Sequence, residues 1–419
     1  MRPAQLQNLT SITRSEVWCL LAITLTGFVL RASTVLAFNG QPESDYLAYR
    51  TMAVNLIEGR GIVDNMGNYA MYNVGYPLLI LAPVFALLGN NLLPVQLINA
   101  MLGAGCSVMC YAIAREIGLG RSGCLLAAAL WALYLPSWVY AEYLAKENLM
   151  TVLMIGVVWC ALQLVKDVSL RVATACGILF GLLALTGNSG LALLSTPVLA
   201  LLVASSPVRR KFVVFSVIVI VALCVVAPWV IRNAQVLGSP VLNTNGGFNL
   251  YLGNNAAATG YFVSIADTPR GNTWERLRAE GEVQASAVLW YEAIDWIVKH
   301  QLQFVELALH KAVLFWKPSI VQANGSVSAI EILLSRLWLL QFVFLVVATI
   351  ASLLLPLSRT RQAAILFLAI ASYTAVHMLF YVSSRYREPI MPVLCALTAL
   401  TLEGVVIRWR GTRVRKCNS

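Results

Sequence analysis

Long apolar runs separated by short basic gaps dominate this sequence and restrict the folds that it can adopt. The first run, 17–38, has about 20 residues, enough for a helix to cross a bilayer and more than the apolar core of a secretion signal. Only 12% of the 419 residues are charged, against about 25% in an average soluble domain. Since helices satisfy their own backbone hydrogen bonds, we expect an all-α polytopic membrane protein whose first run is a retained helix.

About ten transmembrane helices are expected from the apolar lengths and their polar flanks. They lie near residues 17–37, 92–114, 122–141, 147–165, 171–187, 189–205, 212–231, 334–357, 362–382 and 389–408. The run Tyr76–Leu88 has only about 13 residues, so we predict a juxtamembrane or re-entrant helix there. The chain is thus predicted to form a single membrane domain, 1–419, with outer loops at 38–91 and 233–330.

Basic residues concentrate on one side of this predicted topology. Every gap that the topology places in the cytoplasm holds at least two Arg or Lys residues, and so does the tail from Arg408 to Lys416. This bias predicts cytoplasmic termini, and it explains the net charge of +11 better than nucleic-acid binding does. Eight of the nine cysteines fall in predicted helices and Cys417 falls in the tail, which argues against a disulfide framework or a thiolate metal site.

The first outer loop is too polar to lie in lipid, and it contains the first candidate catalytic residue, Asp45. Ser44 is a good N-cap, and the run Asp45–Glu58 is typical of a short amphipathic helix on the membrane surface. A carboxylate at a helix start suits a general base or a metal ligand, but it is also a common helix starter. Glu43 either shares this site or is solvated. The same loop supplies the candidate substrate-binding residues Glu43, Arg60 and Tyr76.

A second group of ionisable residues lies at the outer interface between two predicted spans and comprises Glu142, Lys146 and Glu147. Ionisable groups there are costly unless they pair or face an aqueous cavity, so all three are functional candidates. We interpret Glu142 and Glu147 as candidate catalytic acids and Lys146 as a substrate-binding residue. The structural alternative is a Glu142–Lys146 ion pair at i,i+4 spacing.

Two further motifs on the outer side offer groups for anions and sugars. Arg385, Tyr386 and Arg387 place two guanidinium groups outside, against the charge bias, which suits a phosphate headgroup or, alternatively, arginines that snorkel at a helix end. The segment 228–255 is rich in Asn and Gly with aromatic residues between them. This composition suits sugar binding, and it also describes an ordinary turn-rich loop. Its candidate substrate-binding residues are Arg232, Asn249 and Asn254.

The order and spacing of these motifs carry a family resemblance that runs from the first helix to the last span. The motifs are Glu43-Ser44-Asp45-Tyr46, Gly75-Tyr76-Pro77, Glu147-Asn148-Leu149, Pro228-Trp229, Arg232-Asn233, Asn245-Gly246-Gly247, Gly253-Asn254-Asn255 and Arg385-Tyr386-Arg387. In this arrangement the chain resembles the bacterial membrane glycosyltransferases of the GT-C superfamily, in the branch of protein mannosyltransferases and aminoarabinose transferases.

The resemblance implies a polyprenyl-phosphate sugar donor, a periplasmic active site, and Asp45 as the base with Glu142 or Glu147 as a second acid. A divalent metal serves some members of the superfamily, which leaves its use here open. We therefore expect a multi-pass protein of the bacterial inner membrane that binds lipid and transfers a hexose or pentose, with inversion, to an unidentified acceptor. Arg385, Arg387 and Lys146 would stabilise the leaving phosphate.

A transporter or flippase of lipid-linked sugars is the alternative function. That class would place paired charges deep in the spans and would show two similar halves.

Overall fold

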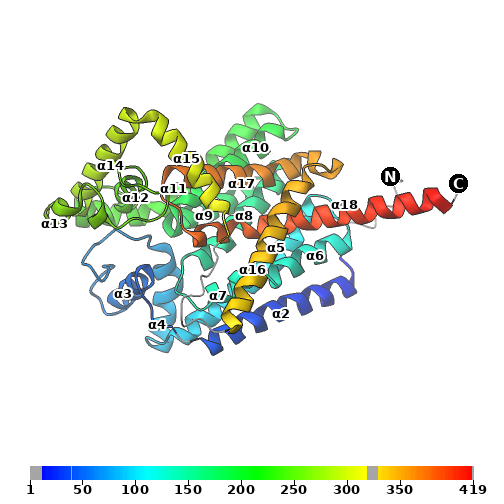
Figure 1. The fold of residues 1–419 in the computed structure, drawn as a ribbon, viewed down its shortest axis with the longest axis horizontal. Helices are drawn as coiled ribbons and strands as arrows, with labels where there is room; N and C mark the ends of the chain where they lie inside the picture. Colours follow the sequence, from blue (N-terminus) through cyan, green and yellow to red (C-terminus); the bar gives the residue numbers. More distant parts are fainter. Residues whose placement is uncertain (1–11, 39, 319–328, 418–419) are drawn as a thin grey trace.

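The computed structural model describes residues 12–38, 40–318 and 329–417, and this part of the chain is almost entirely helical. Figure 1 shows long helices packed together, with several short helices gathered at one end. The described residues form no β-strand, although an isolated parallel bridge joins Tyr261 to Val382. Residues 319–328 of the expected outer loop 233–330 lie outside the described residues. The prediction of an all-α polytopic membrane protein is confirmed.

Seven helices in the described part of the chain are long and apolar enough to cross a membrane. They are α2 (Arg14–Ala37), α5 (Leu92–Glu116), α8 (Glu147–Lys166), α11 (Val208–Leu237), α16 (Ala329–Ser352), α17 (Arg361–Leu379) and α18 (Met391–Cys417). Shorter helices occupy the other three expected spans, namely α6 (Arg121–Ala132), α9 (Leu170–Thr186) and α10 (Ser195–Val203). The order of apolar elements therefore agrees with the prediction, whereas the number of full-length spans is smaller.

The expected span 122–141 forms two helices, because Pro136 cannot continue the first. Proline has no N–H, and its ring clashes with the carbonyl four residues earlier, here that of Ala132, where α6 ends. α7 (Leu135–Tyr140) starts directly after the break. The guanidinium of Arg31 in α2 donates to the carbonyls of Trp131 and Ala132, at 3.2 and 3.3 Å. The prediction of one continuous helix was wrong at this proline.

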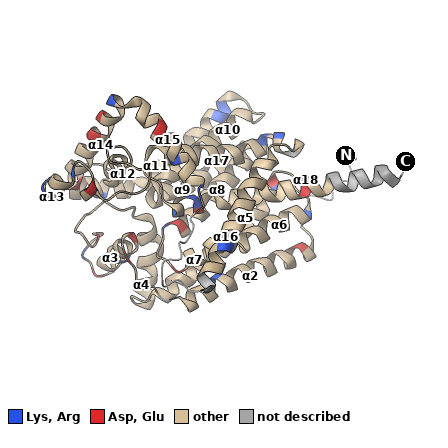
Figure 2. Cartoon of the chain, viewed as in Figure 1, with Lys and Arg blue, Asp and Glu red and all other residues tan. Residues whose placement is uncertain are grey.

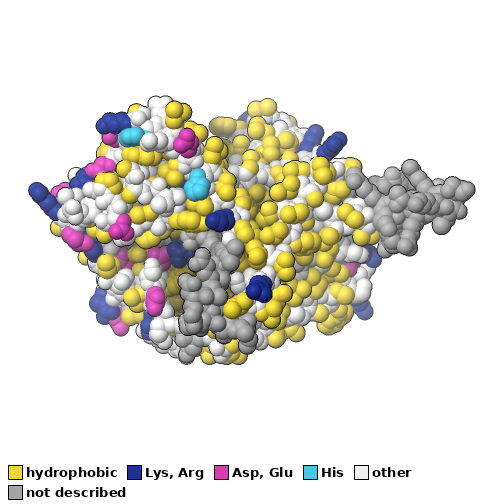
Figure 3. All heavy atoms as spheres, viewed as in Figure 1, with side chains coloured by type: hydrophobic (Ala, Val, Ile, Leu, Met, Phe, Trp, Pro, Cys, Tyr) yellow, Lys and Arg dark blue, Asp and Glu magenta, His cyan; other side chains and the backbone are white. Residues whose placement is uncertain are grey.

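Charged residues gather at the two ends of the molecule and leave an apolar belt between them (Figure 2). The belt appears on the surface as a broad hydrophobic area (Figure 3). One end holds ion pairs of Glu16 with Arg121 (3.2 Å) and of Glu116 with Lys166 (2.7 Å). The opposite end, called the polar end below, holds the short helices. These are α3 (Asp45–Ile57), α12 (Asn245–Gly253), α13 (Trp274–Ala279) and α14 (Glu282–Lys299), followed by α15 (Gln301–Trp316).

Short helices form at the polar end in both stretches of the first outer loop where they were expected, but the expected amphipathic pattern of α3 is weak, because Leu47 and Ile57 are exposed. α3 begins at Asp45, and the run Tyr76–Leu88 forms a π-helical turn, η1 (Pro77–Leu81), and then α4 (Ala82–Leu88). Both η1 and α4 contact α3. This packing holds the first residue of α3 at a defined position over the membrane helices.

The segment 58–76 is fastened to the rest of the polar end through its backbone. Glu282 of α14 accepts hydrogen bonds from the amides of Tyr69 (2.7 Å) and Ala70 (3.1 Å) and from the hydroxyl of Thr244 (2.7 Å). Arg232 of α11 donates to the carbonyls of Ile62 and Tyr69. Because two charged side chains bind backbone groups of this segment, it forms a fixed wall at the polar end.

Candidate active site

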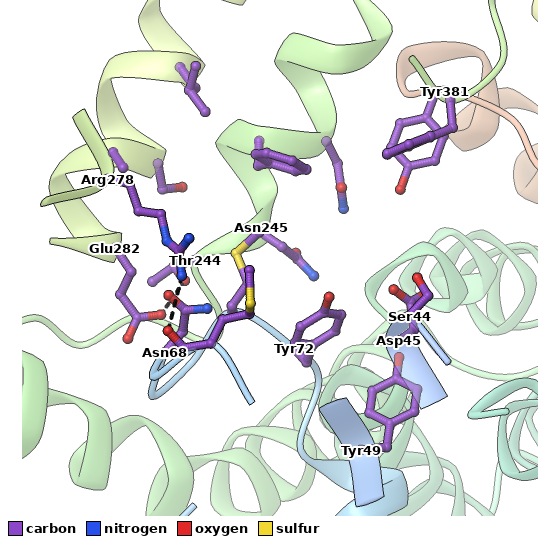
Figure 4. Close-up of a pocket in the computed structure, with 18 of the residues that line it drawn as sticks. Ser44, Asp45, Tyr49, Asn68, Tyr72, Thr244, Asn245, Arg278, Glu282 and Tyr381 are labelled. Carbon is purple, nitrogen blue, oxygen red and sulfur yellow. Dashed lines mark hydrogen bonds between the residues drawn. The ribbon is translucent and has the colours of Figure 1, made fainter. Parts of the chain in front are cut away.

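A cavity of about 280 Å³ lies at the polar end, between α3, the segment 58–76, α12 and α13–α14. Figure 4 shows side chains from these elements around a common space, with Asp45 and Tyr49 on one side and Arg278 and Glu282 on the other. The segment 381–386, between α17 and α18, completes the lining with Tyr381, Arg385 and Tyr386. Residues from both ends of the sequence therefore share one cavity.

Asp45 and Arg385 form an ion pair in this cavity, although 340 positions separate them in the sequence. The Asp45 side chain is 24% exposed and that of Arg385 is 22% exposed, so the pair is mostly buried but open to the cavity. Arg385 also faces Glu147, with 3.6 Å between Nε and Oε1, and its guanidinium lies over the rings of Tyr46 and Tyr386, at 5.7 and 5.4 Å. The guanidinium is thus held between two carboxylates and two aromatic faces.

Ser44, directly before α3, has a strained backbone. Its φ of 50° and ψ of −125° lie in a region that non-glycine residues rarely adopt, and within the described ranges no other non-glycine residue has a positive φ. Ser44 is the N-cap of α3, as predicted, but its hydroxyl makes no capping hydrogen bond. Such strain costs about 1–3 kcal/mol and persists where surrounding contacts hold it, here at the turn that directs Asp45 into the cavity.

Lys146, directly before α8, lies where this cavity meets a second one of about 110 Å³. Its Nζ is 3.5 Å from Oδ1 of Asn73, and Asn73 in turn donates to Asn188 at 2.9 Å. Burial lowers the pKa of Lys146 from its usual value, and the neighbouring carboxylates of Glu147 and Asp45 act in the opposite direction. A half-buried ammonium group therefore faces the junction of the two cavities.

Tyrosine hydroxyls surround the ion pair. Burial raises the pKa of Tyr46 to about 12 and also raises that of Tyr72, so both keep their protons at neutral pH and can donate hydrogen bonds. The hydroxyls of Tyr381 and Tyr386 lie 3.2 Å apart, and both residues line both cavities. The site is therefore rich in neutral donors beside its two cations.

Comparison with known proteins gives one family profile and several solved structures. The profile of the family described as dolichyl-phosphate-mannose-protein mannosyltransferase matches residues 76–231. No curated protein matches the sequence. The archaeal oligosaccharyltransferase AglB from Archaeoglobus fulgidus, in complex with an inhibitory peptide and a dolichol-phosphate, is 14% identical with a TM-score of 0.57, over 97% of this chain and 52% of that chain. The apo form of the Archaeoglobus fulgidus oligosaccharyltransferase is 15% identical with a TM-score of 0.56, over 96% and 52%.

The chain has the fold of the GT-C glycosyltransferases. The resemblance seen in the motifs is thus confirmed at the level of the fold. The chain spans about half the length of the archaeal oligosaccharyltransferases that it matches. ArnT from Cupriavidus metallidurans bound to undecaprenyl phosphate is 16% identical, over 92% of this chain and 78% of that chain, with a TM-score of only 0.45.

The two cavities bring together six of the predicted site residues. These are Asp45, Lys146, Glu147, Asn249, Arg385 and Tyr386. The other seven lie outside both cavities and are Glu43, Arg60, Tyr76, Glu142, Arg232, Asn254 and Arg387. Of the two arginines expected to stabilise the leaving phosphate, only Arg385 shares a cavity with Asp45.

The displaced residues of the first half have structural partners instead. Arg60 forms an ion pair with Glu58, and Glu43 is exposed. Tyr76 is buried and donates to Oδ1 of Asn99 at 3.0 Å. The carboxylate of Glu142 accepts a hydrogen bond from the amide of Gly40, at 2.9 Å, rather than pairing with Lys146. The expected i,i+4 pair therefore does not form, since Lys146 turns toward the cavities.

The displaced residues of the second half stabilise the scaffold. Arg232 fixes the segment 58–76, as described above. The amide of buried Asn254 donates to the carbonyls of Leu250 and Leu379, at 2.8 and 2.7 Å, which links α12 to the end of α17. Arg387 is 1% exposed and donates to the carbonyl of Phe315, with its guanidinium 4.4 Å from the centre of the Phe342 ring.

Several lining residues were missed by sequence reasoning. Trp274 and Arg278 lie four residues apart on α13, a spacing that places side chains on one helical face, and this signal was present in the sequence; Glu282 begins α14 after the break at Gly281. Tyr381 carried no local signal, because it follows a long apolar helix and reaches the site only through the fold.

The geometry of the site bears on the open question of a divalent metal. In the ranges that the structure describes, no three His, Cys, Asp or Glu side chains come together as they would around a metal ion. Asp45 and Glu147 instead share the guanidinium of Arg385. Mg²⁺ usually takes only one or two protein carboxylates beside substrate phosphates and water. Both of these carboxylates are engaged by Arg385, and the reaction proposed below uses only side chains of this protein.

Proposed function

We propose that this protein is an inverting glycosyltransferase that moves a sugar from a polyprenyl-phosphate donor to an acceptor nucleophile. The observation that carries the proposal is the convergence of Asp45, Arg385 and Lys146 on one cavity within the GT-C fold. A carboxylate beside two cations supplies a base for the acceptor and positive charge for the leaving phosphate. The chain is taken to act as one membrane domain with the cavity at its polar end.

The chemistry is a single displacement at the anomeric carbon. The acceptor hydroxyl or amine attacks that carbon from the face opposite the phosphate, while Asp45 takes its proton. The bond between the anomeric carbon and the phosphate oxygen breaks, and its electron pair stays on the lipid phosphate. One displacement inverts the configuration, and the products are the glycosylated acceptor, the polyprenyl phosphate and a protonated Asp45, which then returns its proton to water.

The two cations that line the larger cavity with Asp45 are the groups that would hold the phosphate. Arg385 offers a planar fork that suits phosphate oxygens, and Lys146 offers a compact charge beside it. Glu147 holds the Nε edge of Arg385, with 3.6 Å between the two groups, and thereby orients the fork. Glu147 is therefore assigned a positioning role rather than the role of the base.

The donor class draws support from two of the comparisons. The description of the matching family names dolichyl-phosphate-mannose as part of the enzyme name, and the AglB structure contains a dolichol-phosphate. The charge bias of the sequence supports a bacterial inner-membrane protein with cytoplasmic termini and a periplasmic site, since the basic gaps fall opposite the polar end. The sugar is a hexose or pentose under this proposal.

The test is donor cleavage by the purified protein in lipid nanodiscs. A panel of polyprenyl-phosphate sugars is incubated with the protein, and released polyprenyl phosphate and the configuration of the product are measured. We expect cleavage of at least one donor and an inverted product. Movement of intact donor across a sealed bilayer without cleavage would instead identify a transporter and contradict the proposal.

A further inference from the structure

The cavity of about 280 Å³ has a second half that the proposed chemistry does not use. We call it the distal end and define it by Asn68, Asn245, Phe248, Trp274 and Arg278. Figure 4 shows Asn68 and Arg278 grouped near Glu282, across the cavity from Asp45 and Tyr381. A polar and aromatic chamber therefore faces Asp45 across the cavity.

The distal end combines aromatic faces with hydrogen-bonding groups. The rings of Phe248 and Trp274 meet at 5.5 Å between centroids with 49° between their planes, so they form a corner rather than a stack. The Asn68 amide nitrogen binds Asp64 at 2.8 Å, which leaves its oxygen as an acceptor. The side-chain amide of Asn245 makes no hydrogen bond to any residue in the part of the chain that the structure describes.

Contacts between its walls bridge one side of this chamber. Arg278 donates to the carbonyl of Met66 at 3.0 Å, and Glu282 binds the amides of Tyr69 and Ala70. These bonds join the segment 58–76 to α13 and α14 beside the distal end and narrow the space for an extended ligand. The volume is also at the low end of the range of about 300–1,000 Å³ for small-ligand pockets. The chamber therefore suits a compact group that enters end-on.

We propose that the distal end is the acceptor site and that the acceptor is the terminal residue of a saccharide. A sugar ring has an apolar C–H face and an edge of hydroxyls, which match an aromatic corner next to amides and a guanidinium. A peptide needs an open groove for its flanking residues, and a lipid chain needs an apolar lining. The inference rests on the proposed function, because the acceptor hydroxyl is the group that loses its proton to Asp45.

Two substitutions test this assignment, Trp274→Ala and Arg278→Ala. Each is measured as the ratio of sugar transfer to donor hydrolysis by water, with saccharide, serine-containing peptide and simple alcohol acceptors in the panel. We expect saccharide to be the preferred acceptor of the wild type, and each variant to lower the ratio by about tenfold through a higher KM for the saccharide. Trp274→Phe, which keeps an aromatic face, is expected to restore most of the ratio.

Matched controls separate acceptor binding from folding. Arg276 lies on the same helix as Trp274 and Arg278 but is exposed, and Trp296 stacks on His300 away from the cavity. Arg276→Ala and Trp296→Ala should therefore leave the rates of sugar transfer and donor hydrolysis unchanged. Donor cleavage without preference for saccharide, or without response to Trp274→Ala and Arg278→Ala, overturns this inference alone. Absence of donor cleavage by the wild type overturns it together with the proposed function.

Discussion

Arg385 and Arg387 lie two residues apart on one short helix, η6 (Ser384–Ile390), yet they serve two different regions of the molecule. Arg385 faces the cavity, where its partners are the carboxylates of Asp45 and Glu147. Arg387 faces the packed helices, where its partners are the carbonyls of Phe315 and Lys317 and aromatic rings. A single turn of backbone thus divides a charge available for chemistry from a charge that holds the scaffold.

The difference between the two regions lies in what surrounds each charge. The cavity region pairs ionised groups with one another and leaves them in contact with open space. The core region surrounds its cations with neutral acceptors, as Lys311 illustrates by donating to Oδ1 of Asn254 at 3.0 Å. Substitution in the first region should therefore alter rate and substrate binding, whereas substitution in the second should alter stability.

Asp45→Asn should give the largest effect in the cavity region. Loss of the base is expected to lower kcat for transfer by about 10²–10⁴-fold, with little change in unfolding temperature. Rates with purified protein measure this, and Asp267→Asn, at an exposed position, is the matched control. Wild-type turnover by Asp45→Asn would remove Asp45 from the mechanism.

The two arginines give the direct test of the comparison. Arg385→Ala is expected to lower kcat/KM for the donor by about 10²–10³-fold, because the guanidinium that stabilises the negative charge developing on the leaving phosphate is removed. Donor kinetics are measured for both variants, each serving as control for the other. Equal donor kinetics in Arg385→Ala and Arg387→Ala would show that the division of η6 into two regions is wrong.

Arg387→Ala should act on stability. Its removal leaves the carbonyls of Phe315 and Lys317 without this donor, which is expected to lower the free energy of unfolding by about 1–3 kcal/mol. Thermal or denaturant unfolding in detergent measures the change. The fraction of Arg387→Ala that folds should keep most of its affinity for the donor. A specific loss of donor affinity in this folded fraction would show that Arg387 acts in the cavity region.

Lys146 sharpens the comparison through pH. Because burial lowers its pKa, Lys146 should lose its charge at a lower pH than an exposed lysine, whose pKa is about 10.4. The KM for the donor is expected to rise on the alkaline side as this proton is lost. Lys146→Arg, which keeps its charge, should remove that alkaline rise, whereas an unchanged pH profile would exclude Lys146 from phosphate binding.

Lys311 provides the smallest effect and belongs to the core region. Burial lowers its pKa to about 8, while the same lysine in the unfolded chain titrates near 10.5. Between these values the unfolded chain binds more protons, so the stability of the protein should rise with pH across this window. Unfolding temperatures of the wild type and Lys311→Met measure it, with exposed Lys299→Met as control. The rise should be smaller in Lys311→Met, and equal slopes would contradict the assignment.

The sequence allowed some of the site to be predicted because those residues stand at the ends of apolar runs. Asp45 follows the first span, Lys146 and Glu147 begin another, and Arg385 lies at the start of the last, so the bilayer alone places them at one surface. The same reasoning could not separate Arg385 from Arg387 or Glu147 from Glu142. Whether each of these side chains points into a cavity or into the scaffold depends on the local direction of the backbone, and the packing of neighbouring helices sets that direction.

The amino-acid sequence by itself determined that this chain is a helical membrane protein with its charges at two ends, because long apolar runs have no other stable arrangement in lipid. Only the tertiary structure decided which polar residues share a cavity. The contacts that build it join α3 to the segment 381–386 and the segment 58–76 to α13–α14, over hundreds of positions. Such long-range contacts follow from the packing of whole helices, and no local pattern of residues specifies them.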